Sequence, residues 1–303
     1  MAVSRPGTPT VRPAPSFDPF FPVIVLLGAA AVFWTFTVYQ PAPRRPFPRQ
    51  PADFRSPAAL DAAVQTAEKT LAETPENVEA LLDLAIAQYE RGPSQYKEAL
   101  KSLEKARELG ALDERLFYFA GVMYESENLP EYAAPDLERY ARRHPEDMET
   151  RLRLGNLYFR TDELDKSIDS YRRVLAKKPG DALVSFNLAF VLRDRKNWPE
   201  ALDALKPFTE GGRAMPTGGH KLLGDLFRGR GDLPKALEEY ALERNASGDS
   251  AELALAMAQA YQDAGQDELA LERWEHVAQL DPKNREARTR LRRLKKRLAR
   301  ASR

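Results

Sequence analysis

Cysteine is absent from the 303-residue sequence. Its absence excludes disulfides, cysteine-ligated zinc, iron–sulfur clusters and thiol catalysis. Histidine is scarce, with three copies, and none has the spacing of a metal-binding motif. The glycine-rich stretch at 224–231 lacks the Gly-Lys-Ser/Thr ending of a phosphate-binding loop. We therefore predict a protein that is not an enzyme, with no catalytic residues, no metal and no cofactor.

An excess of one charge sign is also missing, since 46 Lys and Arg face 45 Asp and Glu. The balance hides three different segments. Residues 1–56 hold six Arg and two Asp, and residues 285–303 hold ten basic residues and one Glu. The segment 57–284 holds 30 basic and 42 acidic residues, a net charge of −12. This acidic middle should repel nucleic acid and favour protein partners.

One long uncharged run is present, FFPVIVLLGAAAVFWTFTVY at 20–39. About 20 apolar residues suffice to cross the hydrocarbon core of a bilayer. We predict a transmembrane helix at 20–40, between a disordered Pro-rich segment at 1–19 and a Pro/Arg-rich tether at 41–56. A cleaved signal peptide is the alternative, although the run is long for one and lacks a clear small-x-small cleavage site.

The charges that flank this run bear on its orientation. Arg5 and Arg12 precede it, opposed by Asp18, and four arginines follow it: Arg44, Arg45, Arg49 and Arg55. Basic residues favour the cytoplasmic side. The sequence thus predicts a single-pass protein of the cell (inner) membrane, with the remaining chain in the cytoplasm rather than the periplasm.

From residue 57 onward, apolar residues recur at helical spacing, and a longer repeat is superimposed on them. Small residues recur at intervals of 34 or 35: Gly121, Gly155, Ala189, Gly224 and Ala258. Bulky residues keep the same intervals: Tyr124, Tyr158, Leu192, Phe227 and Tyr261. A small residue on one helix lets a second helix approach, and a bulky one fills the space beside the contact.

The repeat resembles the tetratricopeptide repeat (TPR) family, as in Leu154-Gly155, Tyr158, Tyr171 and Pro179. The resemblance implies an all-α fold, a TPR-type right-handed superhelical solenoid of about six helix-turn-helix repeats, here preceded by a single transmembrane helix. We expect the array to span 57–284, with a partial repeat at 57–77 and repeats at about 78–113, 114–147, 148–181, 182–216, 217–250 and 251–284. The Gly-rich stretch at 209–219 predicts a long loop, or alternatively a hinge between two sub-arrays.

In this family the first helices line a concave face that receives a peptide or helix of another protein. The register places aromatic, amide and Arg side chains there, the usual anchors of an interface. The predicted groove residues are Tyr118, Val122, Asn156, Phe159, Arg160, Phe186, Asn187, Phe190 and Arg193. A clamp for a terminal carboxylate is not expected, because Leu152, Gly218 and Leu222 stand where it requires cations.

Residues 285–303 predict a basic C-terminal capping helix, with a narrow stripe formed by Leu291, Leu294 and Leu298. Its charge exceeds what capping needs. An anionic lipid surface is a possible contact, through Arg292, Arg293, Lys295, Lys296 and Arg297. Nucleic acid and the acidic array itself are the alternatives.

Taken together, these features predict a membrane-anchored TPR scaffold or adaptor that mediates protein–protein interaction. The resemblance points to assembly or quality control of a membrane or envelope complex. The alternatives are a periplasmic or secreted TPR protein after signal-peptide cleavage, and an adaptor that uses its basic C-terminal helix to bind anionic lipid or nucleic acid.

Overall fold

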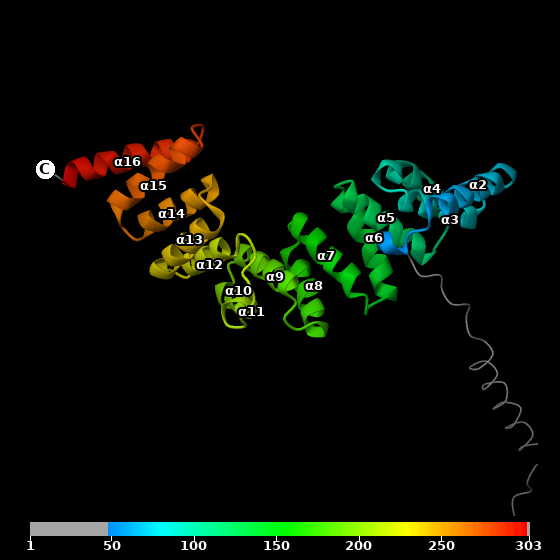
Figure 1. The fold of residues 1–303 in the computed structure, drawn as a ribbon, viewed down its shortest axis with the longest axis horizontal. Coiled ribbons are helices and arrows are strands. Elements are labelled where there is room, and N and C mark those ends of the chain that lie inside the picture. The colour runs from blue at the N-terminus through cyan, green and yellow to red at the C-terminus, as the bar shows by residue number, and fades with distance from the viewer. Residues whose placement is uncertain (1–47, 302–303) are drawn as a thin grey trace, which may run out of the picture. The chain divides into compact units, whose positions relative to one another are not determined.

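The computed structural model describes residues 48–301 (Figure 1). The predicted transmembrane helix at 20–40, the segment at 1–19 and most of the tether at 41–56 lie outside these residues. The chain divides into two units, Met1–Phe54 and Arg55–Arg303. The described part of the first unit holds one short 3-10 helix, η1 (Pro51–Asp53). None of the helices within 48–301 is both long enough and apolar enough to cross a bilayer.

The second unit is built from helices, and its described residues contain no strand. In chain order the helices are α2 (Pro57–Glu73), α3 (Val78–Glu90), η2 (Pro93–Gln95), α4 (Tyr96–Glu108), α5 (Glu114–Ser126), α6 (Pro130–Arg143), α7 (Met148–Arg160), α8 (Leu164–Lys177), α9 (Ala182–Asp194), α10 (Trp198–Ala204), α11 (Lys206–Thr209), α12 (Gly219–Gly229), α13 (Leu233–Ser247), α14 (Ala251–Asp263), α15 (Asp267–Leu280) and α16 (Arg285–Ala301). The predicted all-α class is confirmed.

Short polar side chains start the first helix of most pairs. Asn77, Asp147 and Asp181 each accept a hydrogen bond from the backbone N–H three residues further on, at 3.0, 3.2 and 3.1 Å. Ser250 does the same for α14 at 3.1 Å. These bonds satisfy amides that have no partner inside the helix. The positions of these helix starts are therefore determined by residues within the first turn of each helix.

Each pair is held by close contact between a small residue and a large one. A Cβ atom built on Gly155 of α7 would lie 2.6 Å from Cε1 of Tyr171 on α8. Gly121 of α5 is equally close to Leu137 of α6, at 2.6 Å from its Cγ atom. Each pair then packs on the next, for example α6 on α7 and α8 on α9. One helix pair cannot bury its apolar face alone, so the stacking of neighbours stabilises the whole unit.

The fourth pair is irregular. Its second helix is interrupted at Leu205, so that α10 and α11 replace one longer helix, and Pro207 stands in the first turn of α11. Residues 210–218 then run without helix to Gly218, whose φ of 79° lies in the left-handed region. Glycine adopts this conformation without the steric penalty of a side chain. Whether the segment acts as a hinge stays a prediction.

The start of the second unit is pinned to α3. The backbone N–H of Arg55 donates to Oε2 of Glu90 at 2.7 Å, and its Nε donates to Oε1 at 2.9 Å. The Glu90 side chain is only 2% exposed. Arg55 was predicted to belong to the tether at 41–56. It is instead held in place by Glu90, because a buried carboxylate needs a charged, hydrogen-bonding partner.

Candidate functional site

Three phenylalanines form a partly exposed cluster on the first helices α7 and α9. The ring centroids of Phe159 and Phe190 lie 5.9 Å apart at an interplanar angle of 86°. Those of Phe186 and Phe190 lie 6.3 Å apart. One side of the rings packs on the core cluster of α8, α9 and α12, and the rest stays accessible. Edge-to-face aromatic groups of this kind present a large apolar area with little rotamer freedom.

Leu183 extends this apolar surface, although it was not among the residues predicted for the groove. It is 60% exposed and stands three and seven residues before Phe186 and Phe190 on α9. This spacing places the three side chains on one helix face. An apolar residue at a helix start gives no signal in the sequence of whether a neighbouring helix will cover it.

Two of the predicted groove residues are buried instead, which corrects the predicted groove. Tyr118 is 0% exposed and Val122 is 7% exposed. The Tyr118 ring packs against Phe119 and Tyr140, at centroid distances of 5.3 and 5.1 Å. Every residue of α5 from Leu116 to Met123 is buried, since α5 contacts α3, α4 and α6. The aromatic residues Phe117, Tyr118 and Phe119 of α5 therefore serve the core.

The two predicted amides lie side by side next to the aromatic cluster. Asn187 Nδ2 donates to Asn156 Oδ1 over 3.4 Å, and the hydroxyl of Tyr171 donates to the same oxygen at 2.7 Å. Burial raises the pKa of Tyr171 to about 12, so the hydroxyl remains a donor at neutral pH. Both amides are partly exposed and have hydrogen-bonding capacity left for a polypeptide backbone.

The two predicted arginines have different surroundings. Arg193 lies over Phe190, with its Cζ atom 3.9 Å from the ring centroid. Its guanidinium also pairs with Asp194 at 2.8 Å and with Asp225 of α12 at 3.5 Å. Arg160, by contrast, is exposed and donates to Asn128. Arg193 thus joins the aromatic cluster to the next repeat.

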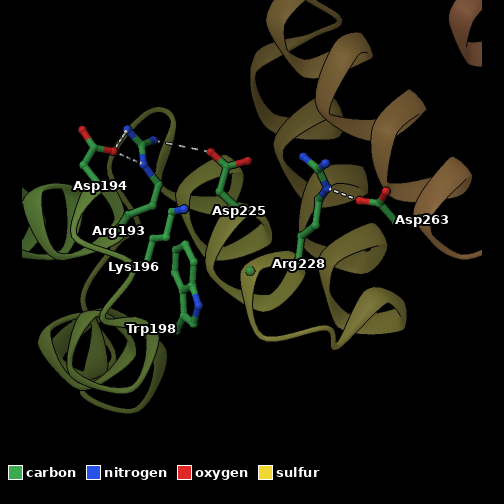
Figure 2. A pocket seen from close by; sticks show the side chains of 8 residues that line it. Arg193, Asp194, Lys196, Trp198, Asp225, Arg228 and Asp263 are labelled. Carbon is green, nitrogen blue, oxygen red and sulfur yellow. Dashed lines mark hydrogen bonds and ion pairs between the residues drawn. The ribbon is translucent and has the colours of Figure 1, made fainter. Parts of the chain in front are cut away.

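A cavity of about 560 Å³ continues from Arg193 along the ends of α9, α12 and α14 (Figure 2). Its lining holds three cations and three carboxylates beside an indole ring: Arg193, Lys196, Arg228, Asp194, Asp225, Asp263 and Trp198, with Gly229. Figure 2 shows Arg193 between Asp194 and Asp225 on one side, and Arg228 paired with Asp263 on the other. Their nearest atoms lie 2.7 Å apart in the second pair.

Among the cations that line the cavity, Lys196 forms no ion pair with any residue of 48–301. It is exposed and has a φ of 59° in the turn before α10. The ring of Trp198 lies at the backbone of Gly229, where an added Cβ atom would come within 2.9 Å of it. The cavity therefore offers one uncommitted ammonium group beside an indole. Arg193 is the one member of this lining that the sequence singled out, because the members come from three different repeats.

Asp225 connects the cavity to the core. It accepts the hydroxyl hydrogen of Tyr240 at 2.8 Å and lies 3.2 Å from Nζ of Lys221. Burial, together with the neighbouring Asp225 carboxylate, raises the pKa of Tyr240 far above its ordinary value. The hydroxyl thus holds the carboxylate in place at every physiological pH. The cations Arg193 and Lys221 then neutralise it.

The first helices are also linked by arginine–carboxylate pairs that cross from one repeat to another. Arg115 binds Glu79 at 2.6 Å, and Arg153 binds Glu125 at 2.7 Å. The pair of Arg228 and Asp263 continues this series toward the C-terminus. These ion pairs therefore neutralise Arg115, Arg153 and Arg228 within the array. The aromatic cluster is the most distinctive feature of the first helices.

Metal-binding groups are not assembled in the part of the chain that the structure describes. No set of three or more His, Cys, Asp or Glu side chains is placed there to hold a metal ion. His144, His220 and His276 lie in separate repeats, each beside a single carboxylate, at 2.9, 2.7 and 3.0 Å.

Two overlapping segments of the chain match the model of a known protein family. Residues 128–182 and 152–214 match the family model described as Tetratricopeptide repeat. No curated protein is similar enough to the sequence to be counted as a relative. The family match and the fold together support a tetratricopeptide repeat protein, as the resemblance implied.

Solved structures with this fold include several repeat arrays. The C-terminal part of a TPR repeat-containing protein from Cytophaga hutchinsonii is 15% identical, with a TM-score of 0.55 over 77% of this chain and 95% of that one. MamA (41-end) from Desulfovibrio magneticus RS-1 is 18% identical, with a TM-score of 0.52 over 58% and 98%. The match to the APC/C hetero-tetramer Cut9–Hcn1 covers 89% of this chain but only 52% of that one, at 14% identity and a TM-score of 0.51. Similarity at identities this low shows a shared fold and nothing further.

Proposed function

We propose that this protein is a scaffold that binds a segment of another protein along α7, α9 and α12. The observation that carries the proposal is the partly exposed cluster of Phe159, Phe186 and Phe190, with the guanidinium of Arg193 over the Phe190 ring. Aromatic and Arg side chains that are already ordered lose little entropy when a partner docks.

The neighbouring groups define the segment that fits. An apolar side chain would cover the three rings and Leu183. The amides of Asn156 and Asn187 would bond the backbone of the segment, as side-chain amides can both donate and accept. A carboxylate further along would meet Lys196 beside Trp198, since this ammonium has no ion-pair partner within 48–301. We therefore propose an extended segment with an apolar residue followed by an acidic one.

The segment at 20–40 is proposed to hold the scaffold at a membrane as a single span, with the array on the cytoplasmic side. A role in assembling or monitoring a membrane or envelope complex follows from that position. The Cut9–Hcn1 structure supports the general idea, since an array of similar fold belongs to a hetero-tetramer there.

Photo-crosslinking tests the groove. Benzoylphenylalanine is introduced at Phe186 in the full chain, in native membranes, and at Tyr132 as the matched control. Tyr132 is an aromatic residue that is 58% exposed on α6, a second helix. We expect one dominant partner at position 186 that position 132 does not capture. Equal capture at both positions, or none at 186, would contradict the groove.

Mass spectrometry of the mature chain tests the anchor separately. An intact N-terminus at Met1 or Ala2, in protein that carbonate washing leaves in the membrane fraction, is the expected result. An N-terminus that begins after the apolar run would contradict the anchor and support the cleaved alternative.

A further inference from the structure

The C-terminal helix α16 packs one face on the array. Ala287 and Leu294 are 0% and 3% exposed, and they join the core cluster of α14 and α15 that contains Trp274. Leu291 packs against the same cluster. This face completes the core of the last pair, which a repeat array needs at its end. The opposite face of α16 is covered by none of the residues that the structure describes.

Ion pairs engage three of the nine cations of α16. Lys295 lies 2.9 Å from Glu275 of α15, and Arg297 pairs with Asp267 of α15. Arg290 pairs with Glu286 of its own helix at 3.4 Å. All three border the packed face. Of the five residues predicted to contact lipid, Lys295 and Arg297 are therefore engaged with the acidic array, because the packing of Leu294 brings them beside α15.

A second group of cations faces away from the array. These residues recur at intervals of three or four, are exposed, and have no carboxylate partner within 48–301: Arg285, Arg288, Arg292, Lys296 and Arg300. We call them the outer basic row. Arg285, Arg288 and Arg292 border an open depression together with Thr289. At a rise of 1.5 Å per residue the row is about 22 Å long.

We propose that the outer basic row binds the anionic headgroups of a lipid bilayer. A straight row of cations on one side of a helix meets a flat anionic surface with all its members at once. Each Lys or Arg close to such a surface strengthens the association about fivefold. No large apolar side chain on α16 is strongly exposed, so the helix would rest on the headgroups without inserting into the bilayer.

The same features disfavour nucleic acid. The row contains no aromatic residue on which a base would stack, and no second basic element flanks it in the described structure. The segment 57–284 carries a net charge of −12, which opposes any polyanion that wraps around the array. A bilayer touches one edge of the array only, so it avoids most of this repulsion.

Because the natural chain has no cysteine, a single label can report on this contact. Ala299 is exposed and lies three residues after Lys296, on the side of the row. The full-length Ala299→Cys protein carries a fluorescent donor, and the bilayer carries an acceptor on its headgroups. Energy transfer is compared between phosphatidylcholine bilayers with and without phosphatidylglycerol, at low and high salt.

We expect phosphatidylglycerol to raise the transfer, and high salt to abolish the increase, since screening shortens to about 3 Å at 1 M. The variant Arg285→Gln, Arg292→Gln, Lys296→Gln and Arg300→Gln should lose the increase, with roughly 600-fold weaker association. Gln keeps the helix propensity close to that of Arg and Lys. Circular dichroism checks that α16 and the array remain folded.

The matched control removes the same charge elsewhere, through Lys69→Gln, Lys97→Gln, Lys105→Gln and Lys177→Gln. These lysines are exposed and have no ion pair among the described residues. The control should keep the phosphatidylglycerol effect. The proposal is overturned if the control loses the effect equally, if the outer-row variant keeps it, or if both bilayers give the same transfer. Binding of duplex DNA to both proteins is measured in parallel. The proposal is also overturned if the row variant loses DNA binding but keeps the phosphatidylglycerol effect.

Discussion

A Cβ atom placed on Gly224 of α12 would lie 2.4 Å from Cε1 of the Tyr240 ring on α13. Real Cβ atoms essentially never approach another atom so closely. The Tyr240 ring is 0% exposed and is tied to Asp225 through its hydroxyl, so it has no open space to move into. The absence of one methyl group at Gly224 therefore sets how closely these two helices pack.

The substitution Gly224→Ala tests this contact. Overpacking of a core costs about 1–3 kcal/mol, which is partly offset by the better helix propensity of Ala, about 1 kcal/mol. We expect a net loss of up to about 2 kcal/mol in the free energy of unfolding, measured with urea. Combined with Tyr240→Leu, which removes the ring, Gly224→Ala should cost much less. A more stable Gly224→Ala protein would show that the ring can yield.

Arg193 and Arg160 should differ in their effect on binding, although both were predicted in the groove. For the segment captured at position 186, Arg193→Ala should weaken affinity by about 1–2 kcal/mol, because it removes the cation over Phe190. Arg160→Ala should leave the affinity almost unchanged, since its guanidinium bonds to Asn128. Titration calorimetry measures both. Equal losses would argue for a general charge effect instead of the aromatic cluster.

Asp113, which caps α5, should contribute stability that depends on pH. Burial acts to raise its pKa, but hydrogen bonds from the side chain and backbone of Arg115 outweigh burial and lower the pKa below the usual 3.8. A lowered folded-state pKa stabilises the protein above the unfolded pKa and loses this effect as pH falls. Asp113→Asn keeps a capping group, so it should cost about 1 kcal/mol at pH 7.

That cost should shrink as the pH falls below about 4, because the unfolded-state carboxyl takes up its proton there, and it should vanish once the pH falls through the lowered native pKa. Urea unfolding of both proteins between pH 3 and pH 7 measures the difference. A cost that stays constant over this range would mean that the charge of Asp113 contributes nothing.

Glu243 should fasten the loop before α12. It is 6% exposed, and its two oxygens accept the N–H groups of Gly218 and Lys221 at 3.1 and 3.3 Å. Glu243→Ala would leave these amides without a partner, and we expect hydrogen exchange at 218–222 to accelerate roughly tenfold or more. Glu243→Gln retains one acceptor and should have a smaller effect. If 210–218 exchanges no faster than the other inter-repeat turns in the native protein, the hinge hypothesis fails.

Much of the fold follows from interactions between residues that lie close in the sequence or within one repeat. The recurring small and bulky residues identify helix pairs, because close helix packing needs a residue such as Gly155 opposite one such as Tyr171. Caps such as Asp147 and Asp181 mark where the first helices start. These signals act within a few residues or within one repeat, so they can be read without knowledge of the neighbouring repeats.

The candidate site was predicted in part for the same reason. Phe159, Phe186 and Phe190 do lie together, as the repeat register implied. Tyr118 occupies a comparable helix and is buried, because its ring packs against Phe119 and against Tyr140 of α6. Aromatic residues look alike in a sequence, and only the surrounding helices decide which of them face a partner. The cavity beside Lys196 was missed, since its lining comes from three repeats.

The sequence by itself determined the repeat, the helical class and the concentration of positive charge in the last residues, since these depend on spacing and composition. Only the tertiary structure decided what each charge does. Packing of Leu294 against α15 turns Lys295 and Arg297 toward Glu275 and Asp267, and the same rotation of α16 turns Arg292 and Lys296 outward. A helix places neighbours in sequence on different faces, so their roles are assigned only once one face is buried.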